Sequence, residues 1–149
     1  VDVLIGINIV PQASIEGARL RSFAEAAGLQ LEPDGAFHYL ADSGNTLYSL
    51  VAADQMPFTF HTLLDKSFPA LTLLFDVPRV AGGVDVFDRA VHFAKHLAQE
   101  FDAQLVDDNR RVLTETGLAR IRDQLLHIYG SMDDRGIAPG SVAALRLFA

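Results

Sequence analysis

Residues 70–78, with the sequence ALTLLFDVP, contain the pattern that most constrains how this chain can fold. Successive side chains of a strand point to opposite faces, so one face would carry an apolar set, Leu71, Leu73, Phe75 and Val77. The other face would carry a mixed set, Thr72, Leu74 and Asp76. The segment therefore predicts a strand with one face against a core and one that is only partly polar.

Five other segments predict strands. Residues 1–10, VDVLIGINIV, place Ile5, Ile7 and Ile9 on a core face and Leu4, Gly6 and Asn8 on the other. Residues 36–40 and 46–51 are joined by ADSGN, which has the residues of a hairpin turn. Residues 103–108 and 110–114 predict two short strands around Asn109.

Three segments show the apolar period of one-sided helices, at residues 14–27, 84–102 and 115–130. Ser14 is the expected N-cap of the first helix and Gly28 its expected stop. A short helix is also expected around 61–66.

These elements predict an α+β fold, a single mostly antiparallel sheet of about six strands with three main helices packed on one face. The other face would be open, and alternation places Leu4, Val51 and Leu74 on it. An uncovered face with apolar side chains is a candidate binding surface. We expect one domain over 1–130. The apolar tail at 131–149 would follow as a final edge strand or, as a second choice, a short packed helix.

Composition excludes several classes of function. The 149 residues include no Cys, so no disulfide or thiolate nucleophile can form. A net charge of −7 argues against a nucleic-acid partner. No apolar run approaches the roughly 20 residues of a membrane span. The chain starts at Val1 without an initiator Met, so we expect it to be part of a longer protein whose missing segment could hold an anchor or linker.

Three clusters are candidates for chemistry. The sequence DDNRR, with Asp107, Asp108, Arg110 and Arg111, is interpreted as a charged turn, because adjacent strand residues face opposite ways. Asp88, His92 and His96 share one helix face, but it lies opposite the apolar stripe and is expected to be solvated surface rather than a metal site. Gly82–Gly83 precede a helix, where Asp85 would repel a phosphate.

No catalytic triad or nucleophile motif is recognisable, so we expect no enzyme activity and no cofactor. Two alternatives stay open at this point. One is a regulatory domain that binds a small molecule or metal through His92 and His96 or through the Gly82–Gly83 turn. The other is an enzyme such as a phosphotransferase or hydrolase.

Four stretches together resemble a known family: LVDDNRRVLTETGLARIRDQL, FHYLADSGNTLYSLVAA, FPALTLLFDVP and INIVPQASIEGARL. They are similar, over about residues 1–129, to the C-terminal domain family of the bacterial cell-division protein ZipA. This resemblance implies a non-enzymatic adaptor. In that family, the C-terminal tail peptide of FtsZ docks in a shallow apolar groove on the open face of the sheet.

Carried over residue by residue, the resemblance places the peptide-binding positions on Leu4, Gly6, Asp34, Ala36, Val51, Ala53, Gln55, Thr72 and Leu74. Several of them depart from the family pattern. Asp34 and Ala53 replace Met, Leu74 replaces a large aromatic residue, and Gln55 replaces a basic one. Smaller side chains predict a shallower or differently shaped groove, in which Asp34 could pair with a basic residue of the peptide.

The resemblance also implies a location. In the full-length family, an N-terminal membrane helix and a long linker tether FtsZ to the cytoplasmic side of the bacterial inner membrane and help septum formation. This chain would thus contact a membrane only through a segment that it lacks. The tail sequence ALRLFA could lie along the groove or pair with a sheet edge.

Overall fold

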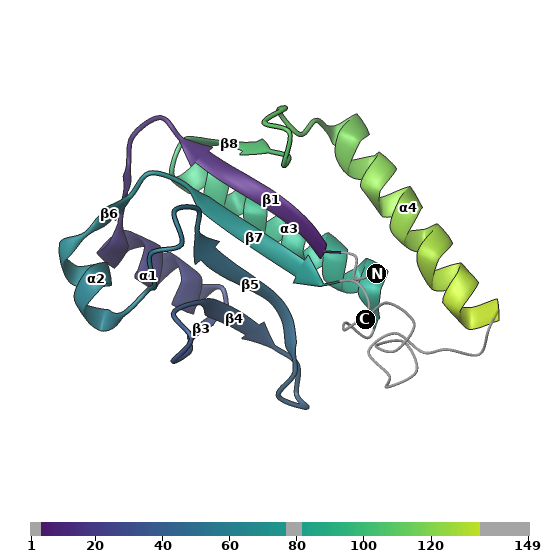
Figure 1. The fold of residues 1–149 in the computed structure, drawn as a ribbon, viewed down its shortest axis with the longest axis horizontal. Helices are drawn as coiled ribbons and strands as arrows, with labels where there is room; N and C mark the ends of the chain where they lie inside the picture. The colour runs from purple at the N-terminus through teal and green to yellow at the C-terminus, as the bar shows by residue number, and fades with distance from the viewer. Residues whose placement is uncertain (1–3, 77–81, 135–149) are drawn as a thin grey trace.

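A six-stranded sheet forms the centre of the computed structural model, which describes residues 4–76 and 82–134 (Figure 1). Its strand order is β3-β4-β5-β7-β1-β8, and each neighbouring pair is antiparallel. The strands are β1 (Leu4–Pro11), β3 (Gln30–Leu31), β4 (Phe37–Leu40), β5 (Thr46–Ala52), β7 (Leu71–Asp76) and β8 (Ala103–Val106). A second sheet joins β2 (Ile15–Glu16) to β6 (Ser67–Phe68).

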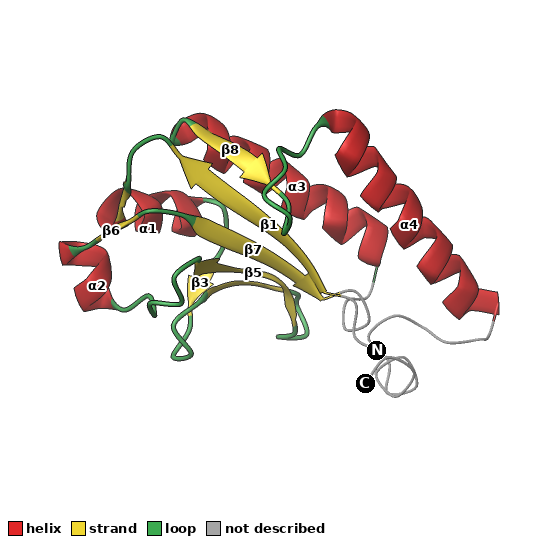
Figure 2. Cartoon of the chain, turned by 45° about the horizontal axis from the view of Figure 1, so that its top comes forward, coloured by secondary structure: helices red, strands yellow, loops and turns green. Residues whose placement is uncertain are grey.

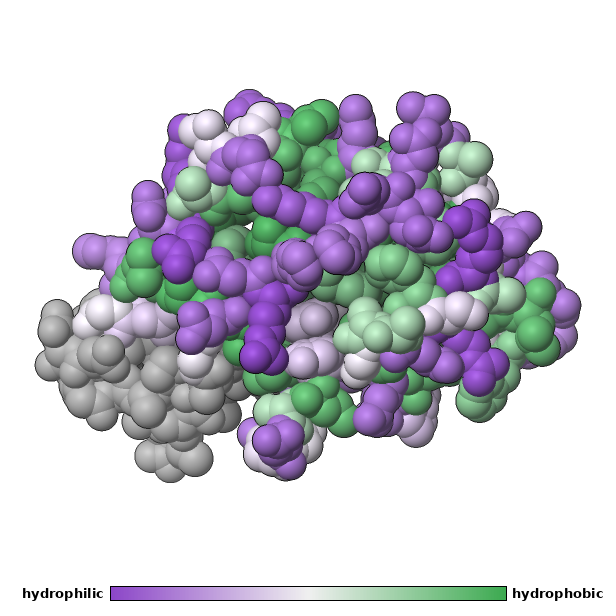
Figure 3. All heavy atoms as spheres, turned by 180° about the vertical axis from the view of Figure 1, so that it is seen from behind, coloured by the Kyte–Doolittle hydropathy of each residue, from purple (hydrophilic) through white to green (hydrophobic). Residues whose placement is uncertain are grey.

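Four helices complete the described fold: α1 (Gly17–Ala26), α2 (Phe60–Asp65), α3 (Gly83–Glu100) and α4 (Glu115–Asp134). Helices α1 and α3 lie behind the sheet in Figure 1, and α4 packs against α3 (Figures 1 and 2). The α+β class, the mostly antiparallel sheet and the three main helices are confirmed. Seen from the helical side, hydrophilic side chains spread over most of the surface, with apolar ones between them (Figure 3).

The core lies between the sheet and the helices, as the alternation predicts. On β7, Leu71, Leu73 and Phe75 are at most 2% exposed, whereas the side chains between them are partly exposed. Phe75 meets Phe87 of α3 edge-on, with 5.9 Å between ring centroids. This contact shows which face of the central strands α3 covers, because the apolar side chains of that face leave water by packing against the helix.

The first helix begins later than predicted. Ser14 is not its N-cap, because Ile15 and Glu16 pair with Phe68 and Ser67 as a short strand, and α1 starts only at Gly17. The backbone groups of this segment are thus used in a sheet rather than in a first helical turn. The predicted stop is correct: Gly28 has φ +89°, and its N–H donates to the Glu25 carbonyl at 3.0 Å.

The second strand of the DDNRR hairpin is also shorter than predicted. Of residues 110–114, only Val112 forms a β-bridge, to Val106. Arg110 has φ 63°, a left-handed conformation that turns the chain before a longer ladder can form. The sequence predicts that the tail begins at residue 131, but residues 131–134 continue α4, which ends at Asp134 rather than at Gly130. Residues 135–149 lie outside the described part of the chain, so a strand or helix there stays a prediction.

Tyr48 predicts a loss of stability at high pH. It is 4% exposed and stacks on Tyr39 with ring centroids 4.9 Å apart. Burial, with a smaller contribution from Tyr39, raises the pKa of Tyr48 to about 12, although Arg89 opposes the shift. The folded state therefore favours the protonated phenol, and that stability is lost as the pH rises from about 10 to about 12.

In urea titrations between pH 9 and 12, we expect the wild type to lose about 1–2 kcal/mol more stability than Tyr48→Phe. Equal losses in the two proteins would show that the Tyr48 hydroxyl does not carry this dependence.

Candidate functional site

The face of the sheet opposite α1 and α3 brings four of the predicted site residues together. Leu74 of β7 lies opposite Gly6 of β1, and Thr72 of β7 lies opposite Val51 of β5. All four are partly exposed, in contrast to the buried residues beside them in each strand. No helix covers this face in the views of Figures 1 and 2. The three central strands therefore present a continuous, partly apolar surface, which we call the open face.

The other predicted site residues lie around or outside this surface. The backbone of Leu4 pairs with Asp76 at the start of β1, and its side chain lies outside the described part of the molecule. Ala36 is 6% exposed and so offers little contact area. Gln55 is exposed, with φ 65°, in the loop after β5.

Asp34 is already engaged within the chain. Its Oδ2 lies 2.7 Å from Nε2 of His38, and its Oδ1 accepts a hydrogen bond from the Ala36 N–H at 3.1 Å. A basic peptide residue would therefore have to share this carboxylate with His38. The pairing of Asp34 with a basic residue of the peptide stays a prediction.

A hollow of about 440 Å³ adjoins the open face. It contains the predicted residues Ala53 and Thr72, together with six that the sequence did not single out as binding residues: Asn8, Val10, Ala70, Val106, Asp108 and Arg110. Val10 is 42% exposed, which is unusual for so apolar a side chain within a sheet. Strand alternation already places Asn8 on the same face as Leu4 and Gly6, and Val10 continues that face, so this pattern could have added both to the binding residues.

Polar side chains bind this surface to the turn beyond β8. The Thr72 hydroxyl donates to Oδ1 of Asn8 at 2.8 Å, and Nδ2 of Asn8 donates to the Asp107 carbonyl at 3.2 Å. A chain of hydrogen bonds thus runs from β7 through β1 to the turn. Polar groups within the partly buried floor are satisfied in this way, so the apolar positions around them can bind a partner without unpaired donors beneath it.

The DDNRR segment is a turn, as predicted, and Asp107 organises it. Oδ1 of Asp107 accepts from the N–H groups of Asn109 and Arg111, both at 2.9 Å. Asp108 instead lies over the sheet, since a Cβ added to Gly6 would be 3.2 Å from its Oδ1. Gly6 therefore lets the turn approach the open face, and the turn supplies one wall of the hollow.

Replacing Asp107 by Ala is expected to cost about 1–2 kcal/mol, because two backbone donors of the turn lose their acceptor. The change would also loosen the wall formed by Asp108 and Arg110. Chemical denaturation measures the first effect. Asp108→Ala is the matched control and should cost less than about 0.5 kcal/mol, since that carboxylate does not hold the turn. Equal losses in the two variants would contradict this assignment.

The histidine face of α3 does not assemble a metal site with Asp88. Asp88 accepts from Arg122 of α4 through Nε at 3.0 Å, and this hydrogen bond raises the pKa of the guanidinium. The rings of His92 and His96 lie 4.2 Å apart. Across residues 4–76 and 82–134, no three His, Asp or Glu side chains gather as metal ligands would.

The Gly82–Gly83 turn has a structural explanation. Gly82 has φ 67° just before α3, and a side chain at Gly83 would collide with the ring of Tyr129. These glycines are required by the backbone and by the packing of α4 on α3.

Comparison with known proteins agrees with this architecture. The chain is similar to the Cell division protein ZipA of Colwellia psychrerythraea strain 34H, at 26% identity over 117 residues. The matched region covers 76% of this chain and 31% of that protein, so the chain spans less than a third of the relative's length. The family described as ZipA, C-terminal FtsZ-binding domain, matches residues 3–124. Because this match covers most of the chain, the protein belongs to the ZipA C-terminal FtsZ-binding domain family.

Proposed function

We propose that this domain is a non-enzymatic cell-division adaptor that binds the C-terminal tail peptide of FtsZ on the open face. The observation that carries the proposal is the uncovered, partly apolar surface formed by β5, β7 and β1. Membership of an FtsZ-binding domain family supports it. A flat sheet face suits a short peptide better than a small substrate, which needs a concave pocket with converging polar groups.

Apolar contacts would supply most of the affinity. Val51, Leu74 and Val10 are the exposed or partly exposed aliphatic side chains of this surface. Each well-buried anchor is worth about 1–3 kcal/mol, from which the cost of ordering the peptide is subtracted. Ala53 and Leu74 stand where the family has larger side chains, so the groove would be shallow and the affinity set by few anchors.

Charge would orient the peptide rather than hold it. Asp108 and Arg110 line one wall of the hollow, and the whole chain carries a net charge of −7. A tail with basic residues beside its apolar anchors would be attracted to such a surface at low salt. Exposed pairs of this kind contribute at most about 1 kcal/mol each.

We further propose that the domain acts at the cytoplasmic side of the bacterial inner membrane, tethered through an N-terminal segment that is absent from this chain. Among the described helices, none has the combination of length and apolar character needed to cross a bilayer. The relative's greater length leaves room for an anchor and a linker outside the matched region.

Fluorescence anisotropy with a labelled tail peptide from the FtsZ of the same organism tests the proposal. We expect saturable binding with a Kd on the order of micromolar, since two or three anchors minus the ordering cost give roughly this affinity. A scrambled peptide of the same composition should bind at least about tenfold more weakly. Absence of saturable binding, or equal binding of the scrambled peptide, would count against the proposal.

A further inference from the structure

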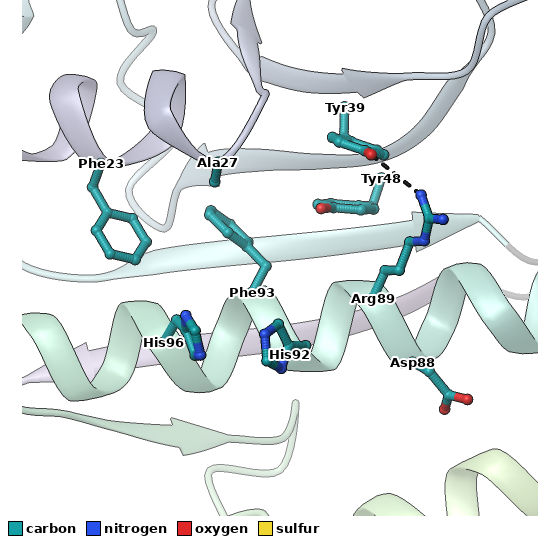
Figure 4. A pocket seen from close by; sticks show the side chains of 9 residues that line it. All are labelled: Phe23, Ala27, Tyr39, Tyr48, Asp88, Arg89, His92, Phe93 and His96. Atoms are coloured by element: carbon teal, nitrogen blue, oxygen red, sulfur yellow. Dashed lines mark hydrogen bonds between the residues drawn. The ribbon is translucent and has the colours of Figure 1, made fainter.

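A second cavity lies on the helical side of the sheet, away from the open face. It is a groove of about 640 Å³ between α1, the β4–β5 hairpin and α3 (Figure 4). This volume falls in the range of pockets that bind small molecules, roughly 300–1,000 Å³. The peptide surface described above contributes none of its lining residues.

The walls of this aromatic groove are mostly rings. Tyr39 and Tyr48 stack with an interplanar angle of 12°, and they project from the hairpin towards α3 (Figure 4). The ring centroid of Phe93 of α3 lies 6.0 Å from that of Tyr48 and 5.9 Å from that of Phe23 of α1, so the rings form one continuous aromatic wall. Such a wall favours a planar, aromatic occupant, because stacked and edge-on ring contacts add to simple area burial.

The positively charged side chain of Arg89 lies at the mouth of the groove (Figure 4). Nη1 of Arg89 donates to the Tyr39 hydroxyl at 3.3 Å, and in the described part of the chain Arg89 forms no ion pair. Most of its N–H donors therefore remain available to an oxygen acid. Asp88, the acidic residue beside it, also lines the groove, but its carboxylate accepts a hydrogen bond from Nε of Arg122 at 3.0 Å.

We propose that the aromatic groove is a binding site for a small planar aromatic carboxylate. The rings would hold the planar body and Arg89 would hold the carboxylate, by the fork geometry that guanidinium groups offer. An acidic protein segment fits less well, because a chain with a net charge of −7 repels a polyanion over its whole surface. A single charge on a small molecule experiences little of that repulsion. The inference goes beyond the proposed function and concerns the opposite side of the sheet.

The test is an NMR titration of the ¹⁵N-labelled domain with 2-naphthoate, and with neutral 2-naphthamide as the matched probe. We expect 2-naphthoate to shift the amide resonances of α3 around Arg89 and Phe93 and of the Tyr39–Tyr48 region, in a saturable manner. The amide probe should bind at least about tenfold more weakly, because it lacks the negative charge that Arg89 would contact.

Arg89→Gln should weaken 2-naphthoate binding by about tenfold, and Arg120→Gln, at an exposed position of α4, should leave it unchanged. If a variant does not fold, the comparison of the two probes on the wild-type domain still tests the inference. The inference is wrong if the groove resonances do not shift saturably, or if removing the charge from the probe or from position 89 leaves affinity unchanged.

A competition experiment separates this inference from the proposed function. Saturating FtsZ tail peptide should leave the affinity for 2-naphthoate unchanged, since the two ligands occupy opposite sides of the sheet. Competition between them would overturn the aromatic-groove site while leaving peptide binding intact. If 2-naphthoate binds and the FtsZ tail peptide does not, the adaptor function is contradicted and the aromatic-groove site is still supported.

Discussion

Leu74→Asp is expected to weaken binding of the FtsZ tail peptide by at least about 30-fold, because burying a Leu contributes about 1.5–3 kcal/mol and a carboxylate in its place must be desolvated. Leu74 lies at the centre of the open face, opposite Gly6 on one side and Ser49 on the other. It is partly exposed in the free domain, so the change should cost the fold little. Anisotropy measures the affinity, and thermal unfolding checks that the variant is folded.

Leu126→Asp is the matched control for this prediction. It makes the same chemical change at a side chain that is 47% exposed on α4, which is not part of the open face. We expect its peptide affinity to match the wild type within about twofold. A folded Leu74→Asp variant that binds the tail as tightly as Leu126→Asp would place the peptide elsewhere.

Gly17→Ala is expected to destabilise the domain by about 3 kcal/mol, at the upper end of the cost of overpacking. Gly17 begins α1 where it meets α2, and a Cβ there would lie 2.7 Å from the Cα of Leu63. The obstacle is backbone, so no side-chain rotation can relieve it. The Gly17 N–H also donates to the Lys66 carbonyl at 3.0 Å, which holds the two segments at this distance.

Gly130→Ala is the matched control in the same assay. A Cβ at Gly130, in α4, meets no atom within 4 Å, and Ala is a better helix former than Gly. We expect Gly130→Ala to gain up to about 1 kcal/mol, and Gly17→Ala to lower the Tm by about 6–12 °C. If Gly17→Ala unfolds at the same temperature as the wild type, the close approach of α1 to α2 is not as described.

The alternation of β1 and β7 was sufficient to predict the sheet and its open face, because the side-chain period of a strand depends only on local geometry. Ile7 and Leu73 fall on the buried side for the same reason that Gly6 and Leu74 fall on the other. The one-sided helices followed from their apolar period. The family resemblance, strongest in the DDNRR region, predicted FtsZ as the partner. The apolar periodicity of strands and helices cannot indicate a partner.

Other features depended on tertiary contacts. Strand β2 contains two residues and forms because β6 lies beside it, so the start of α1 could not be predicted from Ser14. Asp108 and Arg110 line the hollow because Gly6 admits the turn to the sheet, a contact between residues about one hundred positions apart. The aromatic groove likewise joins α1, the β4–β5 hairpin and α3. The residues of such sites come from distant parts of the sequence, so they can be identified as neighbours only once the topology of the fold is known.

The most direct test of the adaptor account is to map the tail peptide on the domain. In an NMR titration with the unlabelled FtsZ tail, the account predicts saturable shifts clustered on β1, β5 and β7, at Gly6, Val51, Thr72 and Leu74. The amides of α1 and α3 that border the aromatic groove should move little. A cluster of shifts on α1 and α3, with the open face unmoved at saturation, would contradict the central claim that the uncovered side of the sheet receives the peptide.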